Sequence, residues 1–346
     1  MAEYIKEKGF TIQSLASDPS PLLEGQVWYN TTSTVLKGYK AVLGTGAWSS
    51  GGALNTGRSD MGGSGTQTAT LAYFGSTGLG ISVAETYDGT SWTNATYGNS
   101  ERYQGGSIGQ LQTDAAYVGG YSAPPPPLQS GKTEKWNGSA WTESGDLQSG
   151  RQGFYGGAGT TAAGLVSGSG PADGATETFD GTSWTEVNNL VTARQYAPVC
   201  GLTSTAAICV GGYGIPSASP YSNGPGSRVG LTETWDGTSW TQSANTLALG
   251  RIAAGLSGTS TDAVIAGGST GDPAPPTAPT ATAETWDGTS WTSVASMADS
   301  NESTGSSSSS STAAISFGGW PGGSISASEE WTVPATTYAT KTFTAS

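Results

Sequence analysis

The sequence contains no histidine and only two cysteines. Without histidine, the chain lacks the commonest metal ligand and the commonest general base of enzymes. Two cysteines are too few for a disulfide framework or for a cysteine-based zinc site. We therefore expect no metal, no cofactor and no catalytic residues, and we predict that the protein is not an enzyme.

Charge and long apolar runs are also scarce. Only 11% of the residues are charged, and 26 acidic against 13 basic residues give a net charge of −13. This sign disfavours binding to nucleic acid or to an anionic membrane. The start, MAEYIKEKGF, has no apolar core of signal-peptide length, and nowhere is an apolar run long enough to span a membrane. We expect a protein made in a cytoplasm, without a signal peptide or membrane insertion.

Glycine and aromatic residues are abundant instead. The chain holds 54 Gly, 12 Trp and 14 Tyr, and short apolar runs alternate with Gly, Ser, Thr and Asn. This pattern is typical of all-β proteins. The aromatic content argues against disorder, because disordered chains lack the apolar surface that compensates for ordering.

A nine-residue motif, ETWDGTSWT at 233–241, recurs along the chain. Its glutamate repeats every 43 to 56 residues, a tryptophan follows seven residues later in five copies, and an arginine follows that tryptophan by ten or eleven. The glutamates are Glu85, Glu134, Glu177, Glu233, Glu284 and Glu329; the tryptophans are Trp92, Trp141, Trp184, Trp240 and Trp291; the arginines are Arg58, Arg102, Arg151, Arg194 and Arg251. Asn301 stands at the sixth arginine position.

Each repeat predicts four strands, which we name a to d. Strand a follows the arginine, strand b is an apolar run that ends in glycine, strand c carries the glutamate, and strand d begins at the tryptophan. Four strands in 40 to 50 residues is the period of a propeller blade. The sixth repeat lacks strand d, but Trp48 lies ten residues before Arg58, as Trp92 does before Arg102. We expect the N-terminal strand around Trp48 to close the ring; YATKTF at 338–343 is the alternative donor.

The order of these motifs over 58–332 resembles kelch repeats. The resemblance implies a six-bladed kelch-like β-propeller, although the turn between strands c and d is shorter than usual and the first and third repeats lack the glycine pair. Kelch propellers serve as binding scaffolds and, less often, as enzymes, so the fold alone does not give the function. The DGTSW turn also resembles the Asp-box of sialidase-type propellers, one residue short; a glycan-active propeller is therefore the less favoured alternative.

Repetition indicates structural roles for the motif residues. A four-residue turn would place Trp235 opposite Trp240, and Asp236 and Gly237 suit the turn itself. We expect the repeated Glu and Arg to pair, because a buried charge needs a partner. Cys200 and Cys209 lie on neighbouring strands, and buried free thiols are the default for a protein made in a cytoplasm, with a disulfide as the alternative.

The connection between strands b and c varies from 8 to 20 residues, whereas the other spacings are nearly constant. Insertions confined to one face often indicate a binding face, although drift in loop length is the alternative. The binding residues predicted there are Tyr121, Pro125, Tyr213, Tyr221, Arg228, Pro275 and Trp320.

The N-terminal segment breaks the repeat. SDPSPLLEGQVWYNTTSTVLKGY at 17–39 indicates a β-hairpin and resembles a segment of tail-fibre and other virion structural proteins of tailed bacteriophages, especially marine ones. The resemblance implies an N-terminal arm (1–44) for virion docking or assembly, a propeller (45–332) and a C-terminal tail (333–346). An ordinary hairpin packed on the propeller is the alternative for the arm.

These observations together predict a phage virion structural protein, a tail fibre or another surface appendage. Residues 1–44 would contact other virion proteins or sister subunits in a homo-oligomer. The b–c loops would contact a glycan or protein of the host surface. A purely structural tail or capsid component without receptor binding is the alternative.

Overall fold

The computed structural model describes residues 12–23, 25–42, 44–122, 128–168, 174–214, 227–270, 278–307, 309–334 and 337–343. All regular structure in these residues is β-strand, and no helix is assigned in them. The chain divides into two compact units. The larger unit is Gly46–Thr332, and the smaller one joins Met1–Thr45 to Val333–Ser346.

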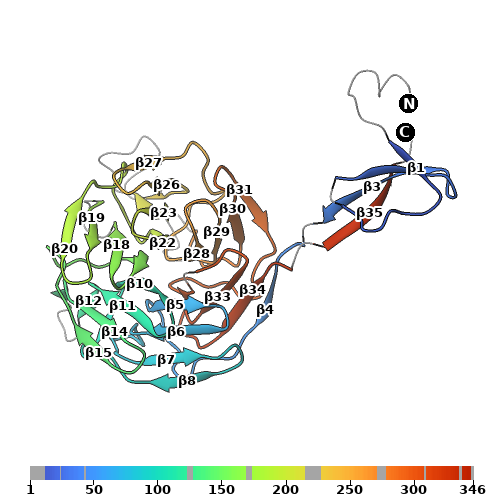
Figure 1. Ribbon diagram of the computed structural model, residues 1–346. Coiled ribbons are helices and arrows are strands. Elements are labelled where there is room, and N and C mark those ends of the chain that lie inside the picture. Colours follow the sequence, from blue (N-terminus) through green and yellow to red (C-terminus); the bar gives the residue numbers. More distant parts are fainter. Residues whose placement is uncertain are drawn as a thin grey trace. The chain divides into compact units, whose positions relative to one another are not determined.

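In the larger unit, each repeat forms an antiparallel sheet with its four strands in the order a, b, c, d, and Figure 1 shows these sheets following one another around a common centre. We number them 1 to 6. Sheet 1 has β5 (Gly62–Thr66), β6 (Ala69–Tyr73), β7 (Ala84–Tyr87) and β8 (Trp92–Ala95); sheet 2 has β10 (Gly106–Leu111), β11 (Asp114–Val118), β14 (Thr133–Trp136) and β15 (Trp141–Glu143); sheet 3 has β17 (Ala158–Thr160), β18 (Ala163–Ser167), β19 (Thr176–Phe179) and β20 (Trp184–Val187). Sheet 4 has β22 (Pro198–Thr203), β23 (Ala206–Val210), β26 (Thr232–Trp235) and β27 (Trp240–Gln242); sheet 5 has β28 (Gly255–Gly258), β29 (Ala263–Ala266), β30 (Ala283–Trp286) and β31 (Trp291–Val294); sheet 6 has β32 (Gly305–Ser306), β33 (Ala313–Phe317), β34 (Ser328–Thr332) and β4 (Ala47–Ser50).

Sheet 6 takes its outer strand from the N-terminal side of the unit. Strand β4 pairs antiparallel with β34, and Trp48 lies opposite Trp331. The two rings are 5.4 Å apart. The predicted position of Trp48 as strand d is therefore confirmed, and the alternative donor at 338–343 lies in the smaller unit instead.

The four-strand prediction misses several short strands. β16 (Tyr155–Gly156) joins sheet 4 as a fifth strand, parallel to β22. Two three-stranded ribbons form where a b–c loop folds back beside the repeated arginine. The first ribbon is β9 (Arg102–Tyr103), β12 (Tyr121–Ser122) and β13 (Leu128–Gln129), and the second is β21 (Arg194–Gln195), β24 (Tyr213–Gly214) and β25 (Ser227–Arg228).

The core lies between neighbouring sheets. Strands b are apolar on both faces, as expected for strands covered on both sides; in β6, Leu71, Ala72 and Tyr73 are fully buried. One cluster packs Ile208 of sheet 4 against Leu256 and Ile265 of sheet 5. Each sheet is therefore stabilised by its neighbours, as the repeat predicts.

The repeated motif forms the outer hairpin of each sheet. Trp235 lies opposite Trp240 with ring centres 5.5 Å apart, which confirms the four-residue turn. Asp236 accepts hydrogen bonds from the amides of Thr238 and Ser239, each at 2.8 Å. Gly237 takes a φ of 95°, which favours glycine. Local turn chemistry thus explains the DG pair.

The smaller unit is one sheet of β1 (Gln13–Leu15), β2 (Val27–Asn30), β3 (Val35–Val42) and β35 (Thr337–Phe343). The predicted hairpin at its centre is present, with Val27 opposite Gly38. Trp28 is fully buried and donates to Asp18 at 3.1 Å. The segment predicted as a separate C-terminal tail is instead a strand of this sheet, because β35 pairs with the whole of β3 from Leu36 to Val42.

Candidate functional site

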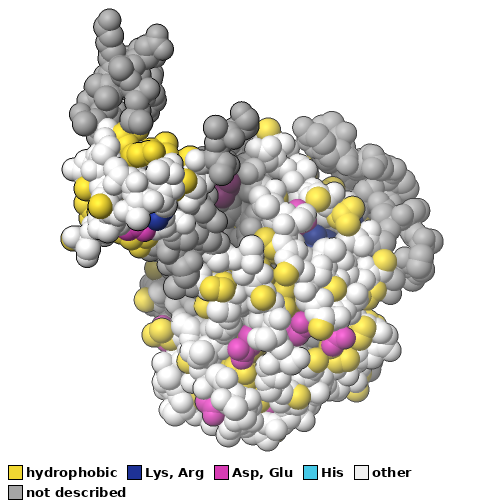
Figure 2. Space-filling model, turned by 90° about the vertical axis from the view of Figure 1, so that its right-hand side faces the viewer, with side chains coloured by type: hydrophobic (Ala, Val, Ile, Leu, Met, Phe, Trp, Pro, Cys, Tyr) yellow, Lys and Arg dark blue, Asp and Glu magenta, His cyan; other side chains and the backbone are white. Residues whose placement is uncertain are grey.

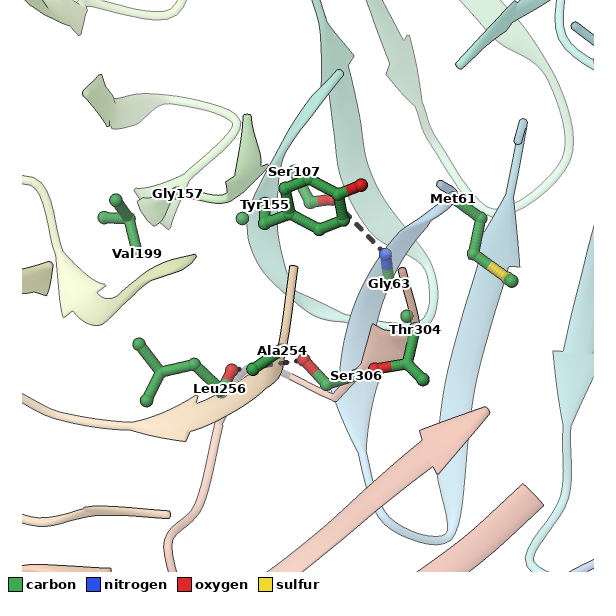
Figure 3. A pocket seen from close by; sticks show the side chains of 12 residues that line it. Met61, Gly63, Ser107, Tyr155, Gly157, Val199, Ala254, Leu256, Thr304 and Ser306 are labelled. Atoms are coloured by element: carbon green, nitrogen blue, oxygen red, sulfur yellow. Dashed lines mark hydrogen bonds between the residues drawn. The ribbon is translucent and has the colours of Figure 1, made fainter. Parts of the chain in front are cut away.

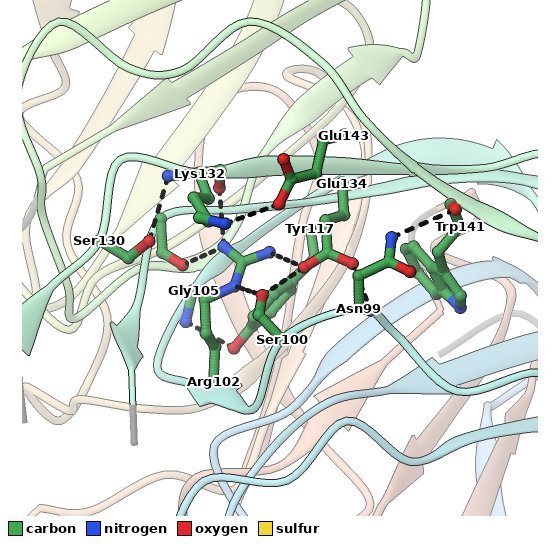
Figure 4. Close-up of polar contacts among 11 residues, drawn as sticks. Asn99, Ser100, Arg102, Gly105, Tyr117, Ser130, Lys132, Glu134, Trp141 and Glu143 are labelled. Carbon is green, nitrogen blue, oxygen red and sulfur yellow. Dashed lines mark hydrogen bonds and ion pairs between the residues drawn. The ribbon is translucent and has the colours of Figure 1, made fainter. Parts of the chain in front are cut away.

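The repeated Glu and Arg form buried ion pairs in five repeats. Arg102 donates to Glu134 at 2.9 Å and to the carbonyls of Gly119 and Lys132 at 2.6 and 2.7 Å (Figure 4). Glu134 also accepts from the amide of Asn99, on the connection that leads into strand a. The other pairs are Arg58–Glu85, Arg151–Glu177, Arg194–Glu233 and Arg251–Glu284. The predicted pairing is therefore present, and it fastens each d–a connection to strand c.

A second repeated feature lies two residues after each of the five arginines and after Asn301. Gly153 and five non-glycine residues have φ between 52° and 82° there, a conformation uncommon outside glycine. Each amide donates to the carbonyl of the residue at the same position in the preceding repeat, at 2.8 to 3.0 Å, and the first donates to the last. We call this set the backbone circuit; it consists of Asp60, Gln104, Gly153, Tyr196, Ala253 and Ser303.

Because neighbouring strands are antiparallel, the start of strand a and the b–c connection lie at the same end of each sheet. The backbone circuit and the variable loops therefore share one face, which we call the b–c face. The turns between strands a and b, and between c and d, lie at the opposite end.

Asp60 and Tyr155 meet at the circuit. The Tyr155 hydroxyl donates to Asp60, and it lies 3.2 Å from the Ser303 hydroxyl. Burial raises the pKa of the Asp60 carboxyl, and hydrogen bonds from Tyr155, Ser303, Ser59 and Gln104 oppose that shift. Burial, followed by the charge of Asp60, raises the pKa of Tyr155 well above its ordinary value. Tyr155 therefore keeps its proton and donates it to the Asp60 carboxyl in a hydrogen bond.

The cavity beside Tyr155 is small. Its volume is ≈ 20 Å³, and its walls come from the first strands of several sheets, including Gly63, Ser107, Val199 and Leu256 (Figure 3). A cavity of this size holds about one water molecule. This volume is too small for an organic ligand.

Tyrosines gather at the circuit. The rings of Tyr103 and Tyr121 lie 5.5 Å apart, and Tyr196 meets Tyr155 edge-on at 6.1 Å. Burial raises the pKa of Tyr196, and Tyr121 and Asp60 add to the shift. Burial, Tyr121 and Asp60 likewise raise the pKa of Tyr103. These groups therefore share one electrostatic neighbourhood, which we call the tyrosine cluster: Tyr103, Tyr121, Tyr155 and Tyr196.

The predicted binding residues fall into two groups. Tyr121, Tyr213 and Trp320 occupy the same place in three repeats, directly after the apolar run of strand b. Tyr213 pairs with Arg228 across β24 and β25, and Trp320 is 38% exposed with its amide bonded to the carbonyl of Glu302. Pro125, Tyr221 and Pro275 lie outside the described residues.

The sequence interpretation missed Asp60, Tyr103, Tyr155 and Tyr196. For Asp60 and Tyr196 a signal was present, because the position two residues after the arginine carries six different residues in the six repeats. Among the described residues, no group of three or more His, Cys, Asp or Glu could hold a metal ion. No helix in the described chain could span a membrane.

The b–c face carries the charged residues Asp60, Glu302 and Arg228. Burial raises the pKa of Glu302, against opposing effects of Ser269 and Arg228, so these groups lie near one another. Figure 2 shows a molecular surface made mostly of uncharged side chains, with scattered carboxylates.

Comparison with known proteins supports the fold alone. No family model matches the chain, and no curated protein matches its sequence. The solved structure of YjhT is similar, with a TM-score of 0.65 and 13% identity over 84% of this chain and 99% of that chain. At this identity the likeness shows a common all-β, propeller-like fold and says nothing of ligand or activity.

Proposed function

We propose that the larger unit is a closed six-bladed, kelch-like propeller in which sheets 1 to 6 are the blades. Two features support this. The backbone circuit returns from Ser303 to Asp60, at 2.9 Å. Sheet 6 also packs on sheet 1, where Phe317 lies 5.0 Å from Trp92 and the Gln67 side chain donates to the Trp331 carbonyl at 2.9 Å.

We further propose that this propeller is a binding module without catalytic activity, and that its b–c face recognises a glycan or protein on a host surface. The tyrosine cluster is the observation that supports this most directly. Tyrosine combines a flat apolar ring with a hydroxyl, and it is a preferred residue of recognition surfaces. The cluster lies on the face with the variable loops, and the cavity below it leaves no room for an enclosed substrate.

The small β-unit and the phage-like segment at 17–39 lead to the second half of the proposal. The protein is a virion component, a tail fibre or another appendage, and the small unit attaches it to other virion proteins. A structural component without receptor binding is the alternative. It differs in one outcome, because its b–c face would be covered in the assembled particle.

Binding of the purified chain to host cells tests the b–c face. Tyr121→Ala should weaken binding about tenfold or more, since a central aromatic residue of an interface contributes on the order of 2 kcal/mol. Leu202→Ala is the matched control, because Leu202 is 42% exposed at the opposite end of sheet 4. If both variants bind host cells equally well, the proposed binding role of the b–c face is wrong. Antibody labelling of whole particles tests the virion assignment, and a labelled b–c face on intact particles excludes the purely structural role.

A further inference from the structure

The sixth repeat departs from the others at one buried position. Asn301 replaces the arginine, yet its backbone keeps the arginine's contacts: its amide donates to Thr280 and its carbonyl accepts from Gly268. Glu329 keeps the place of the repeated glutamate and accepts from the amides of Ala298 and Asp299 at 2.7 and 3.1 Å. The sixth repeat has therefore kept the anion and lost the cation.

The fifth repeat shows what the lost arginine would do. Arg251 donates to Glu284 at 2.7 Å and to the carbonyls of Gly267 and Thr282 at 3.1 and 2.8 Å. Gly267 and Thr282 are joined by a backbone hydrogen bond. In the sixth repeat, Gly318 and Ala327 are joined in the same way. Their carbonyls and Glu329 thus form the same arrangement of acceptors.

These acceptors have no cation in the described part of the chain. Glu329 is only 5% exposed, and no Lys or Arg among the described residues forms an ion pair with it. Asn301 is also 5% exposed, and its Oδ1 has no hydrogen-bond partner there. Within the described residues, two backbone amides are thus all that compensates for the burial of the Glu329 carboxylate, and nothing compensates for the burial of Asn301 Oδ1, which is unfavourable for both groups.

An opening leads to this position. A cavity of ≈ 700 Å³ lies between the b–c loop of sheet 6 and the connection into sheet 1, and its walls include Gly57, Asp299, Asn301, Pro321 and Ala327. This volume is typical of ligand pockets. Asn301 and Ala327 also bound the vacated arginine position, so the cavity adjoins the group of acceptors. We call it the sixth-repeat cavity.

We propose that the sixth-repeat cavity binds a guanidinium group, presented by an arginine side chain of a partner protein, that takes the place of the missing internal arginine. A guanidinium is planar and donates in a fixed fork, which matches a carboxylate flanked by carbonyls better than an ammonium does. Asn301 Oδ1 adds an acceptor that the other repeats lack. The net charge of −13 favours the approach of a cation.

Methylguanidinium is the probe for this site. In the purified protein, millimolar methylguanidinium chloride should raise the melting temperature above the value in equal tetramethylammonium chloride, which carries the same charge but cannot donate. Isothermal titration should show one site per chain. Methylammonium should bind about tenfold more weakly, because it lacks the fork.

Three variants make the test specific. Asn301→Arg should fill the site from within and abolish binding, and Glu329→Gln should weaken it about tenfold through loss of a charge-assisted bond. Arg251→Asn is the matched gain-of-site control, because it should give the fifth repeat a second site. No shift in the wild type, or equal binding of methylammonium, overturns the proposal, as does unchanged binding by Asn301→Arg. The test needs no host ligand, so its result is independent of the proposed function.

Discussion

The buried ion pair of the fourth repeat allows a quantitative prediction. Arg194 and Glu233 are both fully buried, and Arg194 donates to Glu233 at 2.7 Å and to the carbonyl of Cys209 at 3.2 Å. Arg194→Met keeps most of the aliphatic stem but removes the guanidinium. Glu233 would keep only the amides of Val191 and Thr192, at 2.7 and 3.2 Å.

Removing one partner of a buried pair costs about 3–5 kcal/mol, since the remaining charge is desolvated without compensation. We expect that loss in the free energy of unfolding for Arg194→Met, and a similar loss for Glu233→Gln. The double variant should lose less than the sum of the two, with a coupling energy of roughly 0.5–3 kcal/mol, because neither charge is then left alone.

Urea unfolding followed by tryptophan fluorescence and circular dichroism measures these differences. Urea is preferred because guanidinium chloride would carry the cation proposed for the sixth-repeat cavity. The control is Lys132→Met, which breaks the Lys132–Glu143 pair, whose side chains are 47% and 56% exposed. Exposed pairs contribute little, so no resolvable change is expected. If Arg194→Met shifts the midpoint no more than Lys132→Met does, the buried pairs do not stabilise the sheets as argued.

The remaining predictions concern the c–d turn. Four of these turns contain an aspartate whose carboxyl pKa is lowered by hydrogen bonds: Asp88, Asp180, Asp236 and Asp287. Backbone amides donate the most effective of these bonds, except at Asp287, where the Thr289 hydroxyl contributes most. A lowered folded pKa stabilises the protein above the unfolded value of about 3.9, and this stability is lost as the pH falls below it. Asn137 accepts the same backbone hydrogen bonds in the second repeat, so Asn can replace the four aspartates without loss of these contacts. In the variant with all four changed to Asn, the melting temperature should depend less on pH between about pH 4 and pH 2 than in the wild type. An unchanged dependence of the melting temperature on pH contradicts the argument. Gly237→Ala should lower the free energy of unfolding by about 1 kcal/mol or more, because φ is 95° at this position. Urea unfolding measures this loss. The matched control is Gly323→Ala, which should leave stability nearly unchanged because φ is not positive there and no atom lies within 4 Å of the added carbon.

The sequence predicted those features that depend on a repeated local pattern. The four-residue turn, the Trp235–Trp240 pair, the Arg–Glu pairing and the place of Trp48 all follow from fixed spacings. Cys200 and Cys209 are buried free thiols, as expected. Each of these depends on contacts within one repeat or on the alignment of one repeat with the next.

The features that the sequence did not predict depend on contacts between repeats or between distant segments. β35 pairs with β3 although some 300 residues separate them, and neither strand belongs to the repeat whose spacing predicts strand pairing. Tyr155 lies on β16, which pairs with a strand of sheet 4, and its hydroxyl donates to Asp60 of the first repeat. No spacing rule in the sequence describes a side chain that crosses from the third repeat to the first.

The repeat is most informative where it fails. At the circuit position the backbone is the same in all repeats, since φ stays between 52° and 82°, while the side chain changes from Asp60 to Tyr196 to Ser303. The backbone conformation alone would favour glycine at a positive φ, as found at Gly153, so the variety of side chains there fits the proposal that this position contributes to a binding face. Asn301 is a second position at which one repeat differs from the others, and it is buried. An internal arginine is the simplest way to satisfy Glu329, and five repeats use it. In the sixth repeat, the carboxylate of Glu329 stays buried, the internal arginine is absent and a cavity lies next to its position. This combination supports the proposal that an external guanidinium replaces the internal ion pair.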